Sequence, residues 1–171
     1  MIVLMAGLPG TGKSTLAQAV ARRVEGVVLD KDAVRAVLFP ESLITYSTTQ
    51  DDFVIQVMLS TAEYLLGDNP KLVVFLDGRP FSQKYQVDAV VSHAEQIGVP
   101  WRIVESVCSE EVAIQRIQQD EGRHVATNRD AKLYHAVKST FEEITRPKLV
   151  VDTSLVLEMS VEKVEEYLGS C

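Results

Sequence analysis

Near the start of the chain stands Gly7-Leu8-Pro9-Gly10-Thr11-Gly12-Lys13-Ser14-Thr15, which has the spacing G-x-x-x-x-G-K-[ST]. An apolar run, residues 2–6, precedes it, and a helical period follows it. The glycines let the backbone wrap so that its N–H groups point inward at an anion, and the following helix presents its positive end to the same point. In this pattern Lys13 neutralises phosphate charge and the Ser14 hydroxyl ligates Mg²⁺. Residues 7–15 therefore predict a nucleoside triphosphate site; a glycine-rich turn that binds nothing is the disfavoured alternative.

The rest of the chain alternates short apolar runs with helical periods. The apolar runs are continuous, as in strands that are buried on both faces, and they span 2–6, 27–29, 72–76, 103–107 and 149–151. One expected helix carries Leu133, Val137, Phe141 and Ile144 on one face. The closing helix is expected to follow Ser160, which would be its N-cap. Because parallel strands need helical crossovers, the alternation predicts an α/β fold with helices on both faces of a parallel sheet. Ligands of such sheets bind at the carboxyl ends of the strands.

Composition narrows the possible functions. The 171 residues suit one globular domain, and acidic residues outnumber basic ones 24 to 17, giving a formal charge of −7. Sequence-independent binding of nucleic acid normally needs the opposite balance. The two cysteines, Cys108 and Cys171, are too few for a disulfide framework or a thiolate metal site. No apolar run is long enough to cross a membrane, so we expect a reduced, cytoplasmic protein without membrane contact.

Two carboxylates follow the second apolar run, in Asp30-Lys31-Asp32-Ala33-Val34-Arg35. Arg35 lies three residues beyond Asp32, on the same face of the expected helix. A carboxylate there can accept the proton of a hydroxyl while the arginine holds the carboxylate or the substrate. The alternative is a helix N-terminus with Asp30 as its cap and Asp32 in its first turn. Beside a phosphate-binding loop, the functional interpretation is favoured for Asp32.

The third apolar run ends in Asp77, which Gly78-Arg79-Pro80 follows. An apolar strand that ends in Asp is the usual partner of a phosphate-binding loop, where the carboxylate holds Mg²⁺ directly or through water. Arg79 has two open interpretations: it reaches a substrate or phosphate, or it pairs with Asp77.

The segment after the fourth apolar run carries Arg116, Arg123 and Arg129. Arginines on a short segment can close over a triphosphate, stabilise transition-state charge and exclude water. The alternative is a solvated loop in which they pair with acidic neighbours. Function is favoured for Arg116 and Arg123, with Arg123 first.

Together these motifs resemble the small P-loop kinases of the AAA-like "predicted kinase" group. Relatives in that group include the kinase domain of polynucleotide kinase, adenylylsulfate kinase, gluconate kinase, chloramphenicol phosphotransferase and zeta toxins. The resemblance covers nearly the whole chain. It is carried by the loop 7–15, the element 30–35, Tyr46-Ser47, Asp77-Gly78, Arg116 with Arg123, and Leu149-Val150-Val151-Asp152-Thr153.

The resemblance implies one kinase domain over residues 1–171, a three-layer sandwich with strand order 2-3-1-4-5 and a short lid at about 116–130. It implies that Asp32 takes the proton of the acceptor hydroxyl, that Arg35 orients the reactants, and that Arg123 closes from the lid. The phosphates of ATP are then held by Gly7, Leu8, Pro9, Gly10, Thr11, Gly12, Lys13, Ser14 and Thr15. Mg²⁺ is expected at Ser14 with Asp30 or Asp77, and further ATP contacts at Arg116, Asp152 and Thr153.

The sequence thus predicts an ATP- and Mg²⁺-dependent kinase that phosphorylates a hydroxyl of a small molecule. The acceptor is expected between the helix after the second strand and residues 38–53, and the acidic balance leans toward a neutral or cationic acceptor. Two alternatives stay open. One is a kinase for a nucleic-acid 5′-hydroxyl or other RNA end, for which the nearby basic residues are few. The other is an ATP-binding switch or ATPase without an acceptor.

Overall fold

A computed structural model describes residues 1–120 and 130–169, to which the structural statements below refer. Five strands form one sheet: β1 (Ile2–Ala6), β2 (Gly26–Asp30), β3 (Val73–Asp77), β4 (Trp101–Val107) and β5 (Leu149–Asp152). All neighbouring strands are parallel, and their order is β2-β3-β1-β4-β5. The predicted parallel α/β sheet and its strand order are confirmed.

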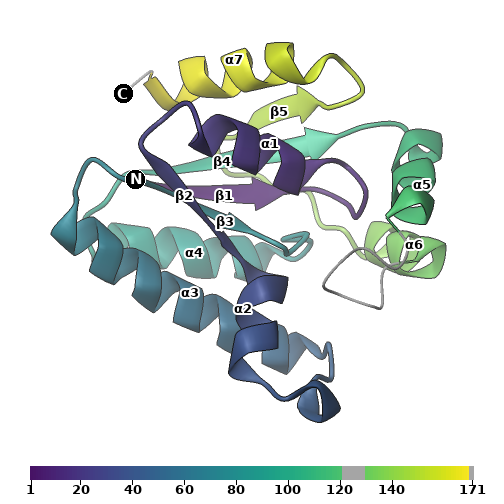
Figure 1. Cartoon of the computed structure of the whole chain (residues 1–171), viewed down its shortest axis with the longest axis horizontal. Helices are drawn as coiled ribbons and strands as arrows, with labels where there is room; N and C mark the ends of the chain where they lie inside the picture. The colour runs from purple at the N-terminus through teal and green to yellow at the C-terminus, as the bar shows by residue number, and fades with distance from the viewer. Residues whose placement is uncertain (121–129, 170–171) are drawn as a thin grey trace.

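Helices cover both faces of this sheet. The described helices are α1 (Lys13–Ala21), α2 (Lys31–Leu38), α3 (Thr48–Asp68), α4 (Lys84–Gln96), α5 (Glu110–Gln119), α6 (Ala131–Ser139) and α7 (Leu157–Gly169), with a 3₁₀ turn at Glu41–Leu43. Figure 1 shows α1 and α7 on one face of the sheet and α3 with α4 on the other, while α5 and α6 lie beyond the carboxyl end of β1. The molecule is therefore the three-layer sandwich that was predicted.

The central strand β1 shows why the apolar runs are continuous. Ile2 and Leu4 pack with α3 and α4, whereas Val3 and Met5 pack with α1 and α7. All four residues are at most 1% exposed. Because successive side chains point to opposite faces and both faces are covered, every position in the strand has to be apolar.

The carboxyl ends of the strands gather the predicted motif residues at one edge of the sheet. The glycine loop follows β1, and Asp30 and Asp77 are the last residues of β2 and β3. These two carboxyl residues stand opposite each other in the register of β2 and β3. The fold therefore places the two carboxylates predicted for Mg²⁺ beside the loop that carries Ser14.

Two boundaries differ from the sequence-based expectation. Helix α7 begins at Leu157, so Ser160 lies inside it instead of capping it. Helix α6 ends at Ser139, although Phe141 and Ile144 continue its apolar period. Both residues pack against the α3–α4 core from an irregular segment. Their apolar spacing therefore reflects burial against this core and not a continuation of α6. No helix within residues 1–120 and 130–169 is long and apolar enough to span a membrane.

Candidate active site

The loop between β1 and α1 has a backbone that only glycine accommodates. Gly7, Gly10 and Gly12 have φ values of 127°, 77° and 78°, which side chains rarely tolerate. Space is equally restricted. A Cβ on Gly7 would lie 2.2 Å from the carbonyl oxygen of Ser106, and one on Gly10 would lie 2.4 Å from that of Ala113. Glycine is therefore required at these positions by the positive φ angles, and at Gly7 and Gly10 also by the neighbouring backbone oxygens, which leave no room for a Cβ.

Lys13 begins α1, and its side chain bends back over the loop. Its Nζ donates to the carbonyl oxygen of Leu8 at 2.8 Å, and Thr11 Oγ1 donates to the same oxygen at 2.7 Å. Lys13 is buried, and it follows Gly12, the residue that precedes the first turn of α1. An ammonium beside the N-terminus of a helix adds to the positive end of the helix dipole, so this loop attracts anions.

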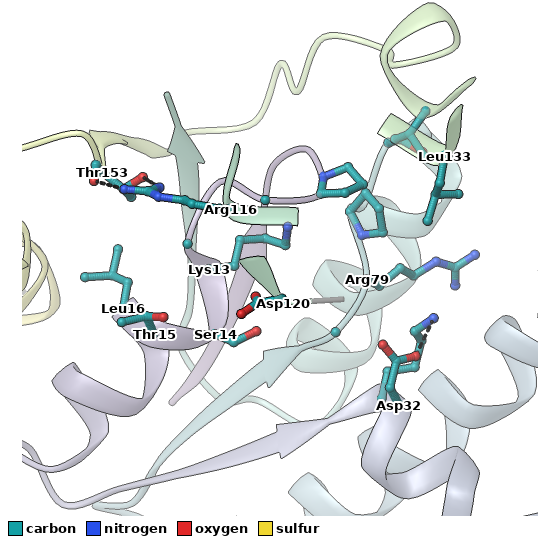
Figure 2. A pocket seen from close by; sticks show the side chains of 18 of the residues that line it. Lys13, Ser14, Thr15, Leu16, Asp32, Arg79, Arg116, Asp120, Leu133 and Thr153 are labelled. Atoms are coloured by element: carbon teal, nitrogen blue, oxygen red, sulfur yellow. Dashed lines mark hydrogen bonds and ion pairs between the residues drawn. The ribbon is translucent and has the colours of Figure 1, made fainter. Parts of the chain in front are cut away.

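The loop lines a pocket of about 630 Å³. We call the part around the loop and β5 its loop end, and the part formed by α2, α3, α6 and residues 78–86 its α2 end. In Figure 2, Thr153 and Arg116 lie on one side of Lys13, and Arg79 and Asp32 on the other. The loop end is lined by Pro9, Gly10, Gly12, Lys13, Ser14, Thr15, Leu16, Arg116, Gln119, Asp120, Thr153, Leu155, Leu157 and Ser160. The α2 end is lined by Lys31, Asp32, Tyr46, Thr48, Asp51, Gly78, Arg79, Pro80, Ser82, Gln86, Leu133 and Val137.

Asp77 is fully buried at the end of β3. Among the described residues, neither of its carboxylate oxygens has a hydrogen-bond partner of good geometry. Burial raises the pKa of Asp77, and the nearby Ser14 hydroxyl and Lys13 ammonium offset that rise only in part. Mg²⁺ prefers oxygen ligands and usually takes one or two protein groups while keeping several waters. A buried, unsatisfied carboxylate beside a hydroxyl fits this ion, so Ser14 and Asp77 are residues that would hold Mg²⁺.

Asp30, the other predicted metal residue, caps α2. Its Oδ1 accepts from the backbone N–H groups of Asp32 at 2.8 Å and Ala33 at 2.9 Å. This is the capping role that the sequence offered as the alternative. Asp30 still lies close to Asp77 and contributes to the raised pKa of that carboxyl. A role of Asp30 in binding Mg²⁺ stays a prediction.

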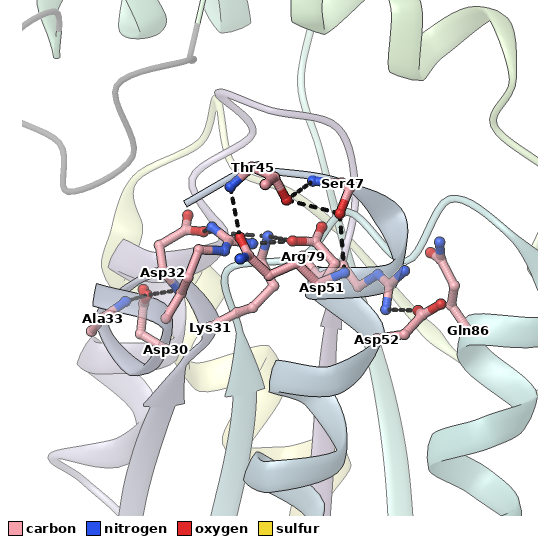
Figure 3. A network of polar contacts seen from close by, with 12 residues as sticks. Asp30, Lys31, Asp32, Ala33, Thr45, Ser47, Asp51, Asp52, Arg79 and Gln86 are labelled. Carbon is pink, nitrogen blue, oxygen red and sulfur yellow. Dashed lines mark hydrogen bonds and ion pairs between the residues drawn. The ribbon is translucent and has the colours of Figure 1, made fainter. Parts of the chain in front are cut away.

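Asp32 lies in a cluster of carboxylates and cations between α2 and α3, shown in Figure 3. Arg35 Nη1 donates to Asp32 Oδ1 at 2.6 Å, and Arg35 Nη2 donates to Asp51 Oδ1. Lys31 Nζ lies 3.3 Å from Asp32 Oδ1 and 3.0 Å from Asp51 Oδ1. Arg35 is 1% exposed and its guanidinium stands 5.0 Å from the ring centre of Tyr46. It is absent from the pocket lining, so it contacts the Asp32 carboxylate from behind.

Arg79 also lines the α2 end, but its partner is not the one that the sequence suggested. Its Nη1 lies 2.7 Å from Asp52 Oδ1, and its Nη2 donates to the Tyr85 hydroxyl at 3.4 Å. Asp52 is on α3, and the docking of that helix brings it to Arg79. The proposed pair of Arg79 with Asp77 is therefore replaced by a pair with Asp52.

At the loop end, Arg116 and Thr153 connect α5 to the residue after β5. Arg116 Nη1 donates to Thr153 Oγ1 at 3.0 Å, and Nη2 donates to the Thr153 carbonyl oxygen at 2.8 Å. Thr153 Oγ1 donates in turn to the carbonyl oxygen of Thr11 at 2.8 Å. Both residues line the pocket, whereas Asp152 is exposed, does not line it, and accepts from Ser154.

Other predicted residues fall outside this set, and some site residues were not predicted. Arg123 and Arg129 lie outside the described residues, as does most of the lid expected at about 116–130. Gly7, Leu8 and Thr11 belong to the loop but do not line the pocket. Pocket-lining residues that the sequence did not single out as site residues include Thr48, Ser82, Gln86, Gln119, Asp120, Leu133, Val137, Leu155 and Leu157. They belong to no motif, and only Thr48, within residues 38–53, lies where the sequence predicted the acceptor.

A family comparison identifies the class to which this site belongs. A family profile described as an AAA domain matches residues 2–144, which is most of the chain. The chain therefore belongs to the AAA domain family. No curated protein matches the sequence.

Solved structures that are similar to this chain include two kinases and the protein Kti12. APS kinase CysC of Mycobacterium tuberculosis, in complex with AMPPNP and APS, is 18% identical with a TM-score of 0.76, over 99% of this chain and 97% of that chain. A gluconokinase of Sinorhizobium meliloti is 19% identical with a TM-score of 0.66, over 99% and 97% of the two chains. Chaetomium thermophilum Kti12, in complex with ADP-AlF3, is 16% identical with a TM-score of 0.72, over 97% and 98%. The chain has the P-loop kinase-like fold of these proteins.

Proposed function

We propose that this protein is a kinase that transfers the γ-phosphoryl group of ATP to a hydroxyl of a small molecule. The observation that carries the proposal is that one pocket holds a phosphate-binding loop at one end and the Asp32 carboxylate at the other. Transfer needs both in one place, whereas a simple ATP-binding module needs only the loop. The complexes of its structural neighbours with AMPPNP and APS, and with ADP-AlF3, agree with a nucleotide at the loop end.

At the loop end, the backbone N–H groups of residues 7–15 and the Lys13 ammonium bind and orient the phosphates. Ser14 and Asp77 are the residues that would hold Mg²⁺. When bound there, this ion would neutralise negative charge on the phosphates. Arg116 and Thr153 shape the wall beside the nucleotide.

At the α2 end, Asp32 orients the acceptor hydroxyl and accepts its proton. The hydroxyl oxygen forms a bond to the γ-phosphorus while the bond from that phosphorus to the β–γ bridging oxygen breaks, which leaves ADP. Arg35 acts as a positioning residue, because it contacts Asp32 and does not line the pocket. Phosphoryl transfer depends mainly on such alignment and on charge stabilisation.

The same proposal treats residues 1–171 as one kinase domain, with a cytoplasmic location in which ATP is available. Closure of a lid at about 116–130, with Arg123 on the phosphates, stays part of the prediction from sequence. Within the described part of that segment, Arg116 is held by Thr153 at the loop end.

The test is acceptor-dependent ADP release from ATP and Mg²⁺ with a panel of polyols, sugar acids, nucleosides, aminoglycosides, phenicols and 5′-hydroxyl oligonucleotides. With an active acceptor, Asp32→Asn should lower kcat by about 10²- to 10⁴-fold and leave the affinity for AMPPNP nearly unchanged. Lys13→Ala should weaken AMPPNP binding. Asp88→Asn, which breaks an ion pair outside the pocket, is the control and should leave both quantities unchanged.

The alternatives predict different results. An ATPase without acceptor would release ADP at a rate that no compound changes, and Asp32→Asn would leave that rate intact. A nucleic-acid kinase would use the oligonucleotide, with an affinity that falls steeply as salt rises. Phosphate transfer to a small molecule, seen as a new ester by ³¹P NMR, would support the kinase proposal.

A further inference from the structure

We infer that the acceptor is uncharged: a neutral polyhydroxylated molecule such as a sugar, a sugar alcohol or a nucleoside. This inference rests on the proposed function, because it concerns the α2 end of the same pocket. Its basis is that each cation described at the α2 end is already bound by a carboxylate of the protein.

Within residues 1–120 and 130–169, the charged groups that contact one another at the α2 end are equal in number. A further carboxylate of the pocket, Asp120, lies beside Lys13 and Ser14 (Figure 2). Three cations and three carboxylates stand there, and each cation has a carboxylate oxygen close by. The ion pairs are Lys31–Asp51 at 3.0 Å, Arg35–Asp32 at 2.6 Å and Arg79–Asp52 at 2.7 Å. The pairs are also linked, since Arg35 donates to Asp51 and Lys31 approaches Asp32. This cluster therefore offers an anion no cation that lacks a carboxylate partner, and its own charges cancel.

Because the three cations are buried, their pairing with carboxylates determines which charge of acceptor can bind. The side chains of Lys31, Arg35 and Arg79 are 7%, 1% and 4% exposed. An anionic acceptor would have to take one of these cations from its carboxylate, and that carboxylate would remain poorly paired with little water to replace its partner. The anion would also stand close to Asp32 and Asp51, and like charges at a recognition site disfavour a ligand.

The remaining lining fits hydroxyl groups. Thr48 and Ser82 offer hydroxyls and Gln86 an amide, so donors and acceptors are mixed around the two pocket-facing carboxylates. Leu133 and Val137 of α6 supply an apolar wall. A molecule with several hydroxyls and one apolar face of C–H groups matches both the polar and the apolar lining. Small-molecule sites commonly combine an apolar wall with a few polar groups that orient the ligand.

Asp52 offers a way to change the balance without altering the lining. It does not line the pocket and its side chain is 43% exposed, whereas its partner Arg79 is buried and does line it. Asp52→Asn therefore removes the carboxylate that neutralises Arg79 and leaves a positive charge facing the acceptor. A neutral site should thereby become a site that accepts an anion.

The first experiment measures anion binding without turnover. Equilibrium dialysis with radiolabelled sulfate is done in saturating AMPPNP and Mg²⁺, so that the loop end is occupied. The quantity of interest is sulfate bound in an Arg79-dependent way, taken as the difference between each protein and its Arg79→Gln counterpart. We expect none for the wild type and about one equivalent for Asp52→Asn, because the positive charge of Arg79 then has no carboxylate partner and can bind sulfate. Asp88→Asn removes the carboxylate partner of Arg146, an arginine outside the pocket, and should gain none.

Two results would overturn the inference. Arg79-dependent sulfate binding by the wild type would show that its cation is available to an anion. Absence of such binding in Asp52→Asn, with AMPPNP still bound, would show that charge balance does not control the site. Both results are read without any acceptor, so they are independent of whether the protein is a kinase.

The second experiment compares acceptors that share a carbon skeleton and differ in charge: D-glucose, D-glucuronate and D-glucosamine, and likewise D-glucitol, D-gluconate and D-glucamine. We expect the neutral member of an active set to have a kcat/KM at least about tenfold higher than either charged member. Asp52→Asn should raise the relative kcat/KM of the anionic member by about tenfold. A wild-type preference for the anion or the cation would contradict the inference. No turnover with any acceptor panel would count against the kinase proposal, while the sulfate result would still decide the charge of the site.

Discussion

Arg35 donates to Asp32 across 2.6 Å from one turn further along α2, and the other nitrogen of its guanidinium fork reaches Asp51 of α3. The same guanidinium stands 5.0 Å from the ring centre of Tyr46. One buried side chain thus joins two helices and fixes the carboxylate proposed to receive the proton. Stability and alignment of the reactants depend on the same contact.

Substitution of Arg35 should therefore affect both properties in a graded way. Arg35→Lys keeps the charge but loses the planar fork that holds two carboxylates at once, so the free energy of unfolding should fall by about 1–2 kcal/mol. Arg35→Met also removes the charge and leaves Asp32 and Asp51 with Lys31 alone, so the loss should reach about 3–5 kcal/mol. Urea denaturation measures both.

The kinetic readout distinguishes a positioning role from a purely structural one. With an active acceptor, folded Arg35→Lys should lower kcat by about tenfold and leave AMPPNP affinity within about twofold. An unchanged kcat at reduced stability would mean that Arg35 only holds α2 to α3.

Asp77 should destabilise the chain in the absence of Mg²⁺, because it is a buried carboxylate without a well-formed hydrogen bond. Asp77→Asn keeps the shape and removes the charge, so the free energy of unfolding in EDTA at pH 7 should rise by about 1–3 kcal/mol. The same variant should lose the stabilisation that Mg²⁺ with AMPPNP gives to the wild type. An Asp77→Asn protein less stable than the wild type in EDTA would contradict this account.

The effect of Asp77 should depend on pH in a defined direction. Folding raises the pKa of this carboxyl from its ordinary value of 3.8, so the folded protein holds the proton more tightly than the unfolded chain. Its contribution to stability is therefore greatest at and below about pH 4 and is lost as the pH rises through the folded-state pKa. The stability difference between Asp77→Asn and the wild type should grow from pH 4 to pH 7 in denaturation experiments. A constant difference would mean that Asp77 keeps its ordinary pKa.

Much of the loop end could be predicted because its determinants are local. The torsions at Gly7, Gly10 and Gly12 could be predicted from a glycine spacing within six residues. The position of Asp77 could be predicted because it ends the apolar run of β3. Periodicity was less reliable where apolar residues are buried outside helices. Phe141 shows this, since it continues the period of α6 but lies after the helix has ended.

The α2 end could not be predicted in detail, because its contacts join separate elements. Arg79 pairs with Asp52 only because α3 docks against β3 and α4, and the sequence equally allowed a pair with Asp77. Likewise, Arg35 was expected to hold Asp32 or a substrate, and its burial behind Asp32 decides that it contacts the carboxylate. The packing of separate helices and strands therefore decides which ion-pair partner an arginine has, where the local sequence allows more than one.

Ser47 should stabilise α3 and, through it, the position of Asp51. Its Oγ accepts from the backbone N–H of Gln50 at 3.2 Å, which caps the helix whose first turn carries Asp51. Ser47→Ala should lower the free energy of unfolding by about 1 kcal/mol, and Ser47→Asp, which keeps an acceptor at the cap, should restore most of it. Equal stability of the alanine and aspartate variants would show that the cap contributes little.

Thr153 should control nucleotide affinity, because its hydroxyl joins the loop to Arg116 at the proposed nucleotide wall. Thr153 Oγ1 donates to the Thr11 carbonyl oxygen at 2.8 Å and accepts from Arg116 Nη1 at 3.0 Å. Thr153→Val keeps the shape and removes both hydrogen bonds, so the Kd for AMPPNP should rise about 3- to 10-fold. Thr153→Ser retains the hydroxyl and should stay within about twofold of the wild type. Isothermal titration calorimetry gives both values. If Thr153→Val binds AMPPNP normally but unfolds more readily, the hydroxyl serves only to hold the loop against β5, and the wall formed by Arg116 and Thr153 is not part of the nucleotide site.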